Sequence, residues 1–203
     1  FLRAAGYSLI DYILSYGLGM FADLKVLDTE NTLENDGLFL QERPPTILTV
    51  ARGAGPKAIA ALRRHIPNTE LLCVGVPTSM DDEECRAAYG MSVAEAQAGL
   101  VTFAEEAGLN GVVCAGSEIE MMRQHARKPL EFSAVAIRPE GIRIEGDDQN
   151  PERVVTPTKA ILAGARRVII GRPVWQAPHP FNAPKRNTDE VAAALEKRTL
   201  VAA

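Results

Sequence analysis

Asp23, Lys25 and Asp28 are three charged residues in an otherwise apolar stretch, Phe21 to Thr32, which reads FADLKVLDTENT. A lysine flanked by two carboxylates keeps its proton, because opposite charges nearby favour the ammonium form. Such an ammonium can stabilise negative charge that develops on a substrate and can donate a proton to it. A structural ion pair at a strand end is the alternative interpretation, which these three residues alone leave open.

The spacing of these residues suits a strand that ends at a site. If residues 20–26 form a strand, Asp23 and Lys25 lie two positions apart and share one face, while Asp28 follows in the next loop. In a barrel of parallel strands, the active site lies at the carboxyl ends of the strands. We therefore expect all three side chains to reach a site at this strand end.

Three other stretches carry polar groups where an apolar run ends. Gly171 and Arg172 follow the run RVII, and a glycine amide beside a guanidinium suits a phosphate dianion. The segment VPTSM, residues 76–80, has hydroxyls that could bond a planar heterocycle, and Gln149 ends the polar loop GIRIEGDDQ. The alternatives are, respectively, a surface arginine after a turn, a Ser/Thr turn and a plain loop.

Short apolar strands that alternate with helices would position these groups. Six strands are predicted, at residues 20–26, 46–52, 71–77, 111–116, 132–137 and 167–172. Helix starts are predicted at the capping box Ser92 to Glu95, at Thr156-Pro157, at Gly55-Pro56 with a helix through His65, and at Thr188 to Glu190 for the last helix. Residues 33–45 show no clear helical pattern. This alternation predicts an α/β protein with a parallel sheet.

Two arrangements of such a sheet are possible, an open doubly wound sheet and a closed (β/α)₈ barrel. No Gly-x-Gly-x-x-Gly follows any predicted strand, which argues against a dinucleotide-binding sheet. A barrel takes about 250 residues and eight strands, whereas this chain has 203 residues and six predicted strands. We therefore expect one (β/α)₈ TIM barrel domain over residues 1–203, with its first two strands absent from this chain.

Composition excludes several classes of function. A net charge of −4 and 46% hydrophobic residues are typical of a globular protein and give no support for a nucleic-acid partner. No apolar run approaches the roughly 20 residues that a membrane helix needs. The three cysteines have no paired spacing, and we expect buried reduced thiols in a cytoplasmic protein. The three histidines have no metal-ligand spacing, so no metal site is expected.

Taken in chain order, these motifs resemble the orotidine 5'-monophosphate decarboxylase family. The first is Asp-x-Lys-x-x-Asp, here residues 23–28, followed by Asn31-Thr32. The others are VPTSM with YGMS (76–80 and 89–92), GVVCAGSE (111–118), GIR to RVVTP (141–157) and AGARRVIIGRPVWQAPHP (163–180). The resemblance covers essentially the whole chain. It implies a (β/α)₈ barrel that forms a homodimer with active sites at the interface.

The resemblance also implies a reaction: loss of CO₂ from C6 of orotidine 5'-monophosphate (OMP) to give UMP, the last step of UMP synthesis, with no metal or organic cofactor. Lys25 would be the general acid that protonates C6. Asp23 would lie beside the substrate carboxylate and disfavour it in the ground state. Asp28 and Thr32 would reach into the partner subunit's site.

The same resemblance assigns substrate binding to four residues. Ser79 would contact the amide edge of the pyrimidine, and Arg172 with the Gly171 amide would hold the phosphate, helped by Gln149. The chain departs from the family pattern in four respects. Thr29-Glu30 follows the second Asp where the family usually has Ile-Pro, and the loop GDDQNPERVVTP is not the family length, so that Pro151 lies nearer than Gln149 to the expected position of the phosphate-loop residue. The family's Asp at the end of strand one and Lys at the end of strand two have no counterpart here, and Ala51 stands where a strand-end His is expected.

Two alternative functions remain open from the sequence. One is a decarboxylase of a keto-sugar phosphate, a sister activity on the same barrel that needs Mg²⁺. The other is a non-catalytic nucleotide-binding barrel. The VPTSM segment and the Gly-Arg-Pro phosphate end favour the pyrimidine enzyme over the first of these.

Overall fold

The computed structural model describes residues 6 and 8–202. In this part of the chain, six strands form one sheet, and their order in the sheet follows the chain, β1-β2-β3-β4-β5-β6. The pairs β1–β2, β2–β3 and β5–β6 are parallel. The strands are β1 (Phe21–Val26), β2 (Ile47–Ala51), β3 (Glu70–Val74), β4 (Gly111–Ala115), β5 (Glu131–Val135) and β6 (Arg167–Val168). All six predicted strands are present, and the α/β class is confirmed, although β6 is much shorter than predicted.

Helices and 3₁₀ turns connect consecutive strands, as parallel pairing requires. The α-helices are α2 (Ser8–Leu14), α3 (Glu30–Leu40), α4 (Gly55–His65), α5 (Asp82–Tyr89), α6 (Val93–Glu106), α7 (Ile119–His125), α8 (Pro157–Ala163), α9 (Arg172–Trp175) and α10 (Ala183–Ala202). The 3₁₀ turns are η1 (Arg52–Ala54), η2 (Gly116–Glu118) and η3 (Pro151–Arg153). Helix α4 has the predicted bounds.

Capping motifs in the sequence predicted two helix starts correctly and a third incorrectly. The Ser92 and Glu95 side chains and backbones bond reciprocally before α6, and the Thr156 hydroxyl accepts from the Lys159 amide at the start of α8. The prediction that Thr188 opens the last helix is wrong, because α10 begins at Ala183. The Thr188 hydroxyl instead donates to the carbonyl of Pro184 within the helix.

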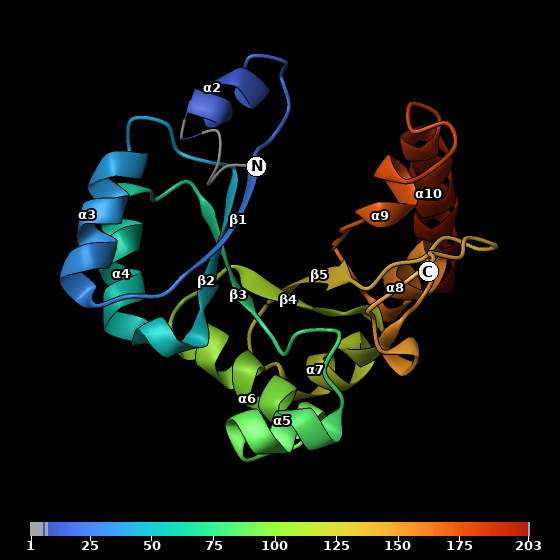
Figure 1. Cartoon of the computed structure of the whole chain (residues 1–203). Coiled ribbons are helices and arrows are strands. Elements are labelled where there is room, and N and C mark those ends of the chain that lie inside the picture. Colours follow the sequence, from blue (N-terminus) through green and yellow to red (C-terminus); the bar gives the residue numbers. More distant parts are fainter. Residues whose placement is uncertain (1–5, 7, 203) are drawn as a thin grey trace. The chain divides into compact units, whose positions relative to one another are not determined.

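The contacts divide the chain into two compact units, of which the first comprises residues 1–74 and 102–112. In it, α3 and α4 lie side by side (Figure 1). Gly37 allows their close approach, since a Cβ there would lie 3.0 Å from the carbonyl oxygen of Leu62. This contact explains why a glycine sits inside α3, in the segment whose pattern did not indicate a helix. Leu33 and Leu62 are fully buried in this unit.

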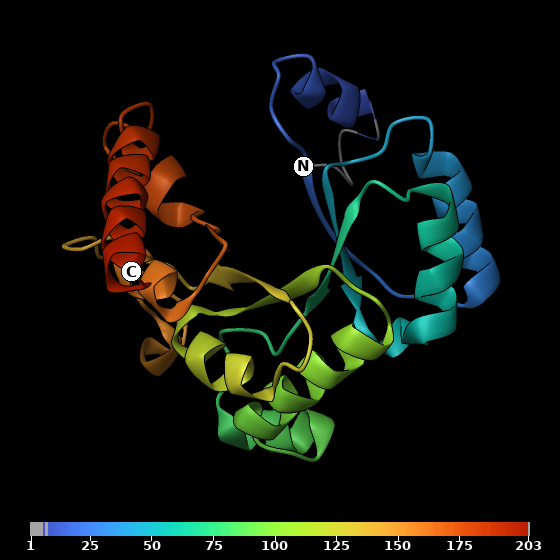
Figure 2. The ribbon, with the colours of Figure 1, turned by 180° about the vertical axis from the view of Figure 1, so that it is seen from behind.

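The second unit comprises residues 75–101 and 113–203. Helices α8 and α10 lie against each other in it (Figure 2). The Arg198 guanidinium of α10 donates to the carbonyls of Ile161 and Ala165 at 3.2 and 3.0 Å. Ile161 lies in the last turn of α8 and Ala165 just beyond its end, so this arginine joins α10 to the C-terminal end of α8.

The three cysteines are free and buried, as predicted. Burial raises the pKa of the Cys73 thiol to about 12 and raises that of Cys114 as well. Both groups therefore stay protonated and unreactive at neutral pH. Across the described part of the chain, no helix is both long and apolar enough to cross a membrane.

Candidate functional site

The strand that carries the Asp-x-Lys motif is irregular where the motif lies. Ala22 pairs with Leu48 and Val26 pairs with Val50, so β1 uses four positions where β2 uses two. Lys25, inside this irregularity, has a φ of 51°. Left-handed backbone costs a non-glycine residue about 1–3 kcal/mol and clusters at functional sites. Lys25 and Ala136 are the two described residues other than glycine with positive φ.

Thr49 of β2 holds this irregular backbone and the first carboxylate together. Its hydroxyl oxygen accepts from the Lys25 amide at 2.9 Å and donates to Asp23 Oδ1, also at 2.9 Å. The other oxygen of Asp23 contacts Lys25 Nζ at 2.5 Å. Asp23 and Lys25 therefore meet as expected, but through a bulge and not through the regular alternation of a strand. Thr49 is fully buried, while both charged side chains are about half exposed.

Asp28 and Thr32 lie together at the start of α3. Asp28 Oδ1 accepts from the Thr29 amide at 2.7 Å, and the hydroxyls of Thr29 and Thr32 are 3.2 Å apart. Two hydrogen bonds lower the pKa of Asp28 below its usual range, the larger effect coming from the Thr29 backbone amide and the next from the Thr32 side chain. Asp28 is exposed. It therefore remains a carboxylate at the surface of the first unit through the whole physiological range of pH.

In the second unit, the segment that follows β3 is joined to the loop that carries Gln149. The Thr78 hydroxyl donates to the side-chain oxygen of Gln149. The amide of Asn150 donates to the Thr78 carbonyl at 3.0 Å. One bond between side chains and one between backbones therefore fix the loop against the segment. Ser79, the next residue of the segment, is exposed.

Arg172 and Gln149, the two side chains predicted to bind phosphate, converge on one carboxylate oxygen. Asp148 Oδ1 accepts from the Arg172 guanidinium at 2.5 Å and from Gln149 Nε2 at 2.9 Å. Both hydrogen bonds lower the pKa of Asp148, and the one from Gln149 has the larger effect. Arg172 also pairs with Asp147 at 2.9 Å, and Asp147 forms a bidentate pair with Arg138. The two donors can therefore meet on a single anionic oxygen.

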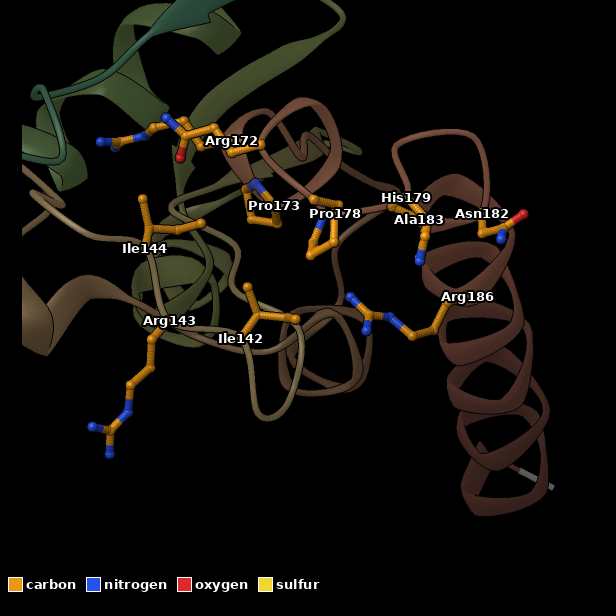
Figure 3. A pocket seen from close by; sticks show the side chains of 12 residues that line it. Ile142, Arg143, Ile144, Arg172, Pro173, Pro178, His179, Asn182, Ala183 and Arg186 are labelled. Carbon is orange, nitrogen blue, oxygen red and sulfur yellow. The ribbon is translucent and has the colours of Figure 1, made fainter.

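Gly171 precedes α9, and its carbonyl accepts from the amides of Val174 and Trp175. A cavity of about 360 Å³ lies beside this turn, with Arg172 as the only predicted site residue among the described residues that line it. In Figure 3 the Arg186 side chain extends toward Ile142 and Pro178 on the cavity wall. Both apolar and positively charged side chains therefore line this cavity.

Thr49, Asp148 and Arg153 contact predicted site residues or their segments but were not themselves predicted from the sequence. Thr49 was detectable in principle, because a hydroxyl inside the apolar run TILTVA is out of place in a buried strand. Asp148 and Arg153, whose guanidinium donates to the carbonyls of residues 76, 77 and 80, lie in a charged stretch of chain, where such residues are ordinary and give no signal. Within the described ranges, no group of three or more His, Cys, Asp or Glu side chains could hold a metal ion.

In a comparison with known protein families, the model of the orotidine 5'-phosphate decarboxylase / HUMPS family matches residues 1–186. Among individual relatives, an orotidine 5'-phosphate decarboxylase of Methylobacterium sp. (strain 4-46) is 35% identical over 197 residues, covering 94% of this chain and 81% of that protein. One of Streptococcus suis (strain 05ZYH33) is 30% identical over 181 residues, covering 88% and 77%.

Solved structures show the same fold. The crystal structure of orotidine 5'-phosphate decarboxylase from Lactobacillus acidophilus has a TM-score of 0.76 at 24% identity, covering 92% of this chain and 81% of that one. The enzyme from Pyrococcus horikoshii OT3 gives a TM-score of 0.66 at 21% identity, covering 91% and 81%.

The contacts of Thr49 lead to a testable prediction. Thr49→Val keeps the shape of the side chain but leaves the Lys25 amide and Asp23 Oδ1 without this partner. We expect a loss of about 1–3 kcal/mol in the free energy of unfolding, measured by denaturant titration. Thr49→Ser keeps the hydroxyl and is the matched control, which should recover most of the loss. Equal stability of the valine and serine variants would contradict the role of the hydroxyl.

Proposed function

This chain belongs to the orotidine 5'-phosphate decarboxylase / HUMPS family, and we propose that it decarboxylates OMP to UMP without a metal or organic cofactor. The observation that carries the proposal is the geometry of the Asp-x-Lys motif. Lys25 has strained left-handed backbone, and its ammonium lies 2.5 Å from the Asp23 carboxylate. Strain of this kind persists where the surrounding structure holds it, as the bonds of Thr49 do here.

The proposed chemistry follows from where charge develops in the reaction. When the bond from C6 to the carboxylate breaks, CO₂ leaves and the electron pair stays on C6. The Lys25 ammonium stabilises this carbanion and then gives C6 a proton from Nζ. Asp23 lies beside the substrate carboxylate and disfavours its charge in the ground state. Because the Asp23 carboxylate also contacts the Lys25 ammonium, the two groups are oriented as one unit.

Substrate binding is proposed for residues of the second unit. Arg172 and Gln149 hold the phosphate with the Gly171 amide, and Ser79 bonds the amide edge of the pyrimidine. The convergence of Arg172 and Gln149 on one Asp148 oxygen supports this assignment, because two donors that meet on a carboxylate oxygen can also meet on a phosphate oxygen. Binding energy gained at the phosphate can offset the unfavourable contact between Asp23 and the substrate carboxylate.

The oligomer and the complete barrel also remain proposals. We propose a homodimer in which Asp28 and Thr32 serve the partner's site. Asp28 is exposed, and its neighbour Leu27 is 59% exposed, which suits burial in an interface. The six strands follow one another in chain order, as consecutive strands of a (β/α)₈ barrel do, so we propose that residues 1–203 belong to one such barrel domain. We also propose a cytoplasmic location, because the three cysteines are free thiols.

The role of Lys25 predicts the first functional test. Lys25→Ala removes the proton donor, so we expect turnover of OMP to fall below detection while UMP binding stays measurable. The loss of OMP absorbance and calorimetric titration with UMP check the two halves of this statement. Lys185→Ala is the control, because Lys185 forms an exposed pair with Asp189 on α10. We expect this variant to keep full activity.

Appreciable turnover by Lys25→Ala would refute the role of Lys25. The same assay with EDTA present distinguishes the pyrimidine enzyme from the Mg²⁺-dependent keto-sugar-phosphate alternative. We expect no loss of activity in EDTA, whereas inhibition by the chelator would contradict the proposal of a metal-free reaction. Binding of UMP with no turnover by the unaltered chain would favour the non-catalytic alternative.

Shared active sites predict complementation between two inactive variants. Lys25→Ala and Asp28→Ala are each expected to be severely impaired as homodimers. In a mixed dimer, the Lys25 of one subunit meets the Asp28 of the other, so one of the two sites is complete. Random mixing should then restore roughly a quarter of the unaltered activity, by the statistics of a twofold dimer. No recovery after verified subunit exchange would show that Asp28 serves its own subunit.

Asp148 predicts a gain of binding. Because its carboxylate holds the two donors proposed for the phosphate, Asp148→Asn should tighten UMP binding roughly two- to fivefold, as expected for an exposed ion pair. Arg172→Ala should weaken binding about ten- to a hundredfold, since it removes bonds to a charged group. Calorimetric titration measures both. Weaker binding by Asp148→Asn would show that Asp148 supports the phosphate site and does not compete with it.

A further inference from the structure

We propose that Arg153 is a positioning residue, which holds the segment 76–80 in the shape that presents Ser79 and ties this segment to the loop of Gln149. The proposal rests on the proposed function for the roles of Ser79 and Gln149. The claim that Arg153 holds this segment depends only on its contacts in the structure and not on the proposed function. Arg153 is not expected to touch the substrate.

The guanidinium of Arg153 binds three carbonyls of one short segment. Nη1 donates to the carbonyls of Pro77 at 2.5 Å and Met80 at 3.2 Å, and Nη2 donates to that of Val76 at 3.0 Å. This segment follows the end of β3 at Val74, so its backbone has lost the hydrogen-bonded ladder of the sheet. The planar fork of one arginine therefore replaces several bonds that a strand would have made.

A buried carboxylate orients this guanidinium. Glu118 Oε1 accepts from Arg153 Nε at 2.7 Å and lies 2.7 Å from Nη2. Glu118 Oε2 in turn accepts from Gln97 Nε2 at 2.5 Å and from the Ala115 amide at 3.1 Å. Both oxygens of the carboxylate are thus satisfied. The guanidinium has little freedom to rotate away from the three carbonyls.

Burial argues that this pair serves geometry more than stability. Arg153 is 6% exposed and Glu118 is 9% exposed. Burial raises the pKa of Glu118, against the opposing effect of the Arg153 charge. Removing two charges from water costs about as much as their attraction returns, so a buried ion pair is a poor source of net stability. Its most direct consequence here is a fixed conformation of the segment 76–80.

The chain around Arg153 is built to keep the residue in place. Asn150 caps η3 by accepting from the Glu152 amide, and Pro151 fixes the first backbone angle of this turn. The Asn150 amide binds the Thr78 carbonyl, and the Arg153 guanidinium binds the carbonyls on either side of it. Residues 150–153 therefore bind the segment 76–80 through their first and last members, Asn150 and Arg153.

The turn that carries Glu118 and the chain around Arg153 are closely packed. Gly116, at the start of η2, has Val155 against it, and a Cβ on Gly116 would lie 2.3 Å from Val155 Cγ2. The Ser117 hydroxyl contacts the carbonyl of Arg153 at 3.4 Å. The turn that carries Glu118 therefore packs directly on the chain that carries Arg153.

The test compares Arg153→Lys with Arg123→Lys. The lysine keeps the charge opposite Glu118 but cannot reach three carbonyls at once. Arg123 is the control, because its guanidinium donates to the carbonyl of Ala163, away from this segment. We expect Arg153→Lys to lower kcat/KM for OMP about ten- to a hundredfold, and Arg123→Lys to leave it within about twofold. Thermal unfolding of both variants identifies any loss of folded protein.

Coupling to Ser79 separates positioning from a general structural defect. If Arg153 acts through Ser79, then Ser79→Ala should lower kcat/KM much less in the Arg153→Lys background than in the unaltered chain. Thr32→Ala, in the first unit, should have the same effect in both backgrounds. Additive effects of Arg153→Lys and Ser79→Ala would overturn the proposal. If Arg153→Lys does not fold, Glu118→Gln, which removes only the orienting charge, takes its place with the same expected coupling.

Hydrogen exchange provides a readout that does not depend on activity. Amides of residues 78–80 and of Asn150 should exchange faster in Arg153→Lys, while those of α10 should not change. Unchanged exchange in this segment would overturn the proposal even if activity fell. If the unaltered chain does not turn over OMP, the proposed function fails, and exchange alone then decides the positioning role of Arg153.

Discussion

Backbone groups lose their partners in the sheet where a strand bulges or ends, and both clusters of predicted site residues are built from what replaces those partners. In the first unit the Lys25 amide binds the Thr49 hydroxyl. In the second unit the carbonyls that follow β3 bind the Arg153 guanidinium. Buried polar backbone groups must be satisfied. Side chains that satisfy them at strand ends therefore also fix the residues proposed to meet the substrate.

The charged groups of the two clusters are held in two different ways. Asp23 and Lys25 form a half-exposed pair, whose orientation depends on the buried hydroxyl of Thr49. Arg153 and Glu118 form a buried pair in which every carboxylate oxygen has a donor. An exposed pair contributes little to stability, and a buried one roughly balances its own desolvation. In both clusters the bonds contribute mainly geometry, which is what catalysis by preorganised charge requires.

The alternation of apolar runs with capped helices was enough to predict all six strands and the class of the sheet. Strong local signals succeeded, such as the capping box of Ser92 and the Gly55-Pro56 start of α4. Weak or misleading ones failed. Thr188 has the residue type of a cap but lies inside α10, and Gly37 disguised a helix whose glycine is required by contact with α4. Propensity describes one segment at a time, whereas both of these outcomes depend on neighbours in space.

The sequence by itself determined the family of the chain and the residues that we propose for its site, because motif spacing and residue type are properties of the chain alone. Only the tertiary structure revealed Thr49 and Arg153, which act through bonds to residues 24 and 76 positions away. It also decided that Asp23 and Lys25 meet through a bulge in β1. The physical reason is that hydrogen bonds between distant segments leave no periodic trace in a sequence, although they decide which orientation each functional group keeps.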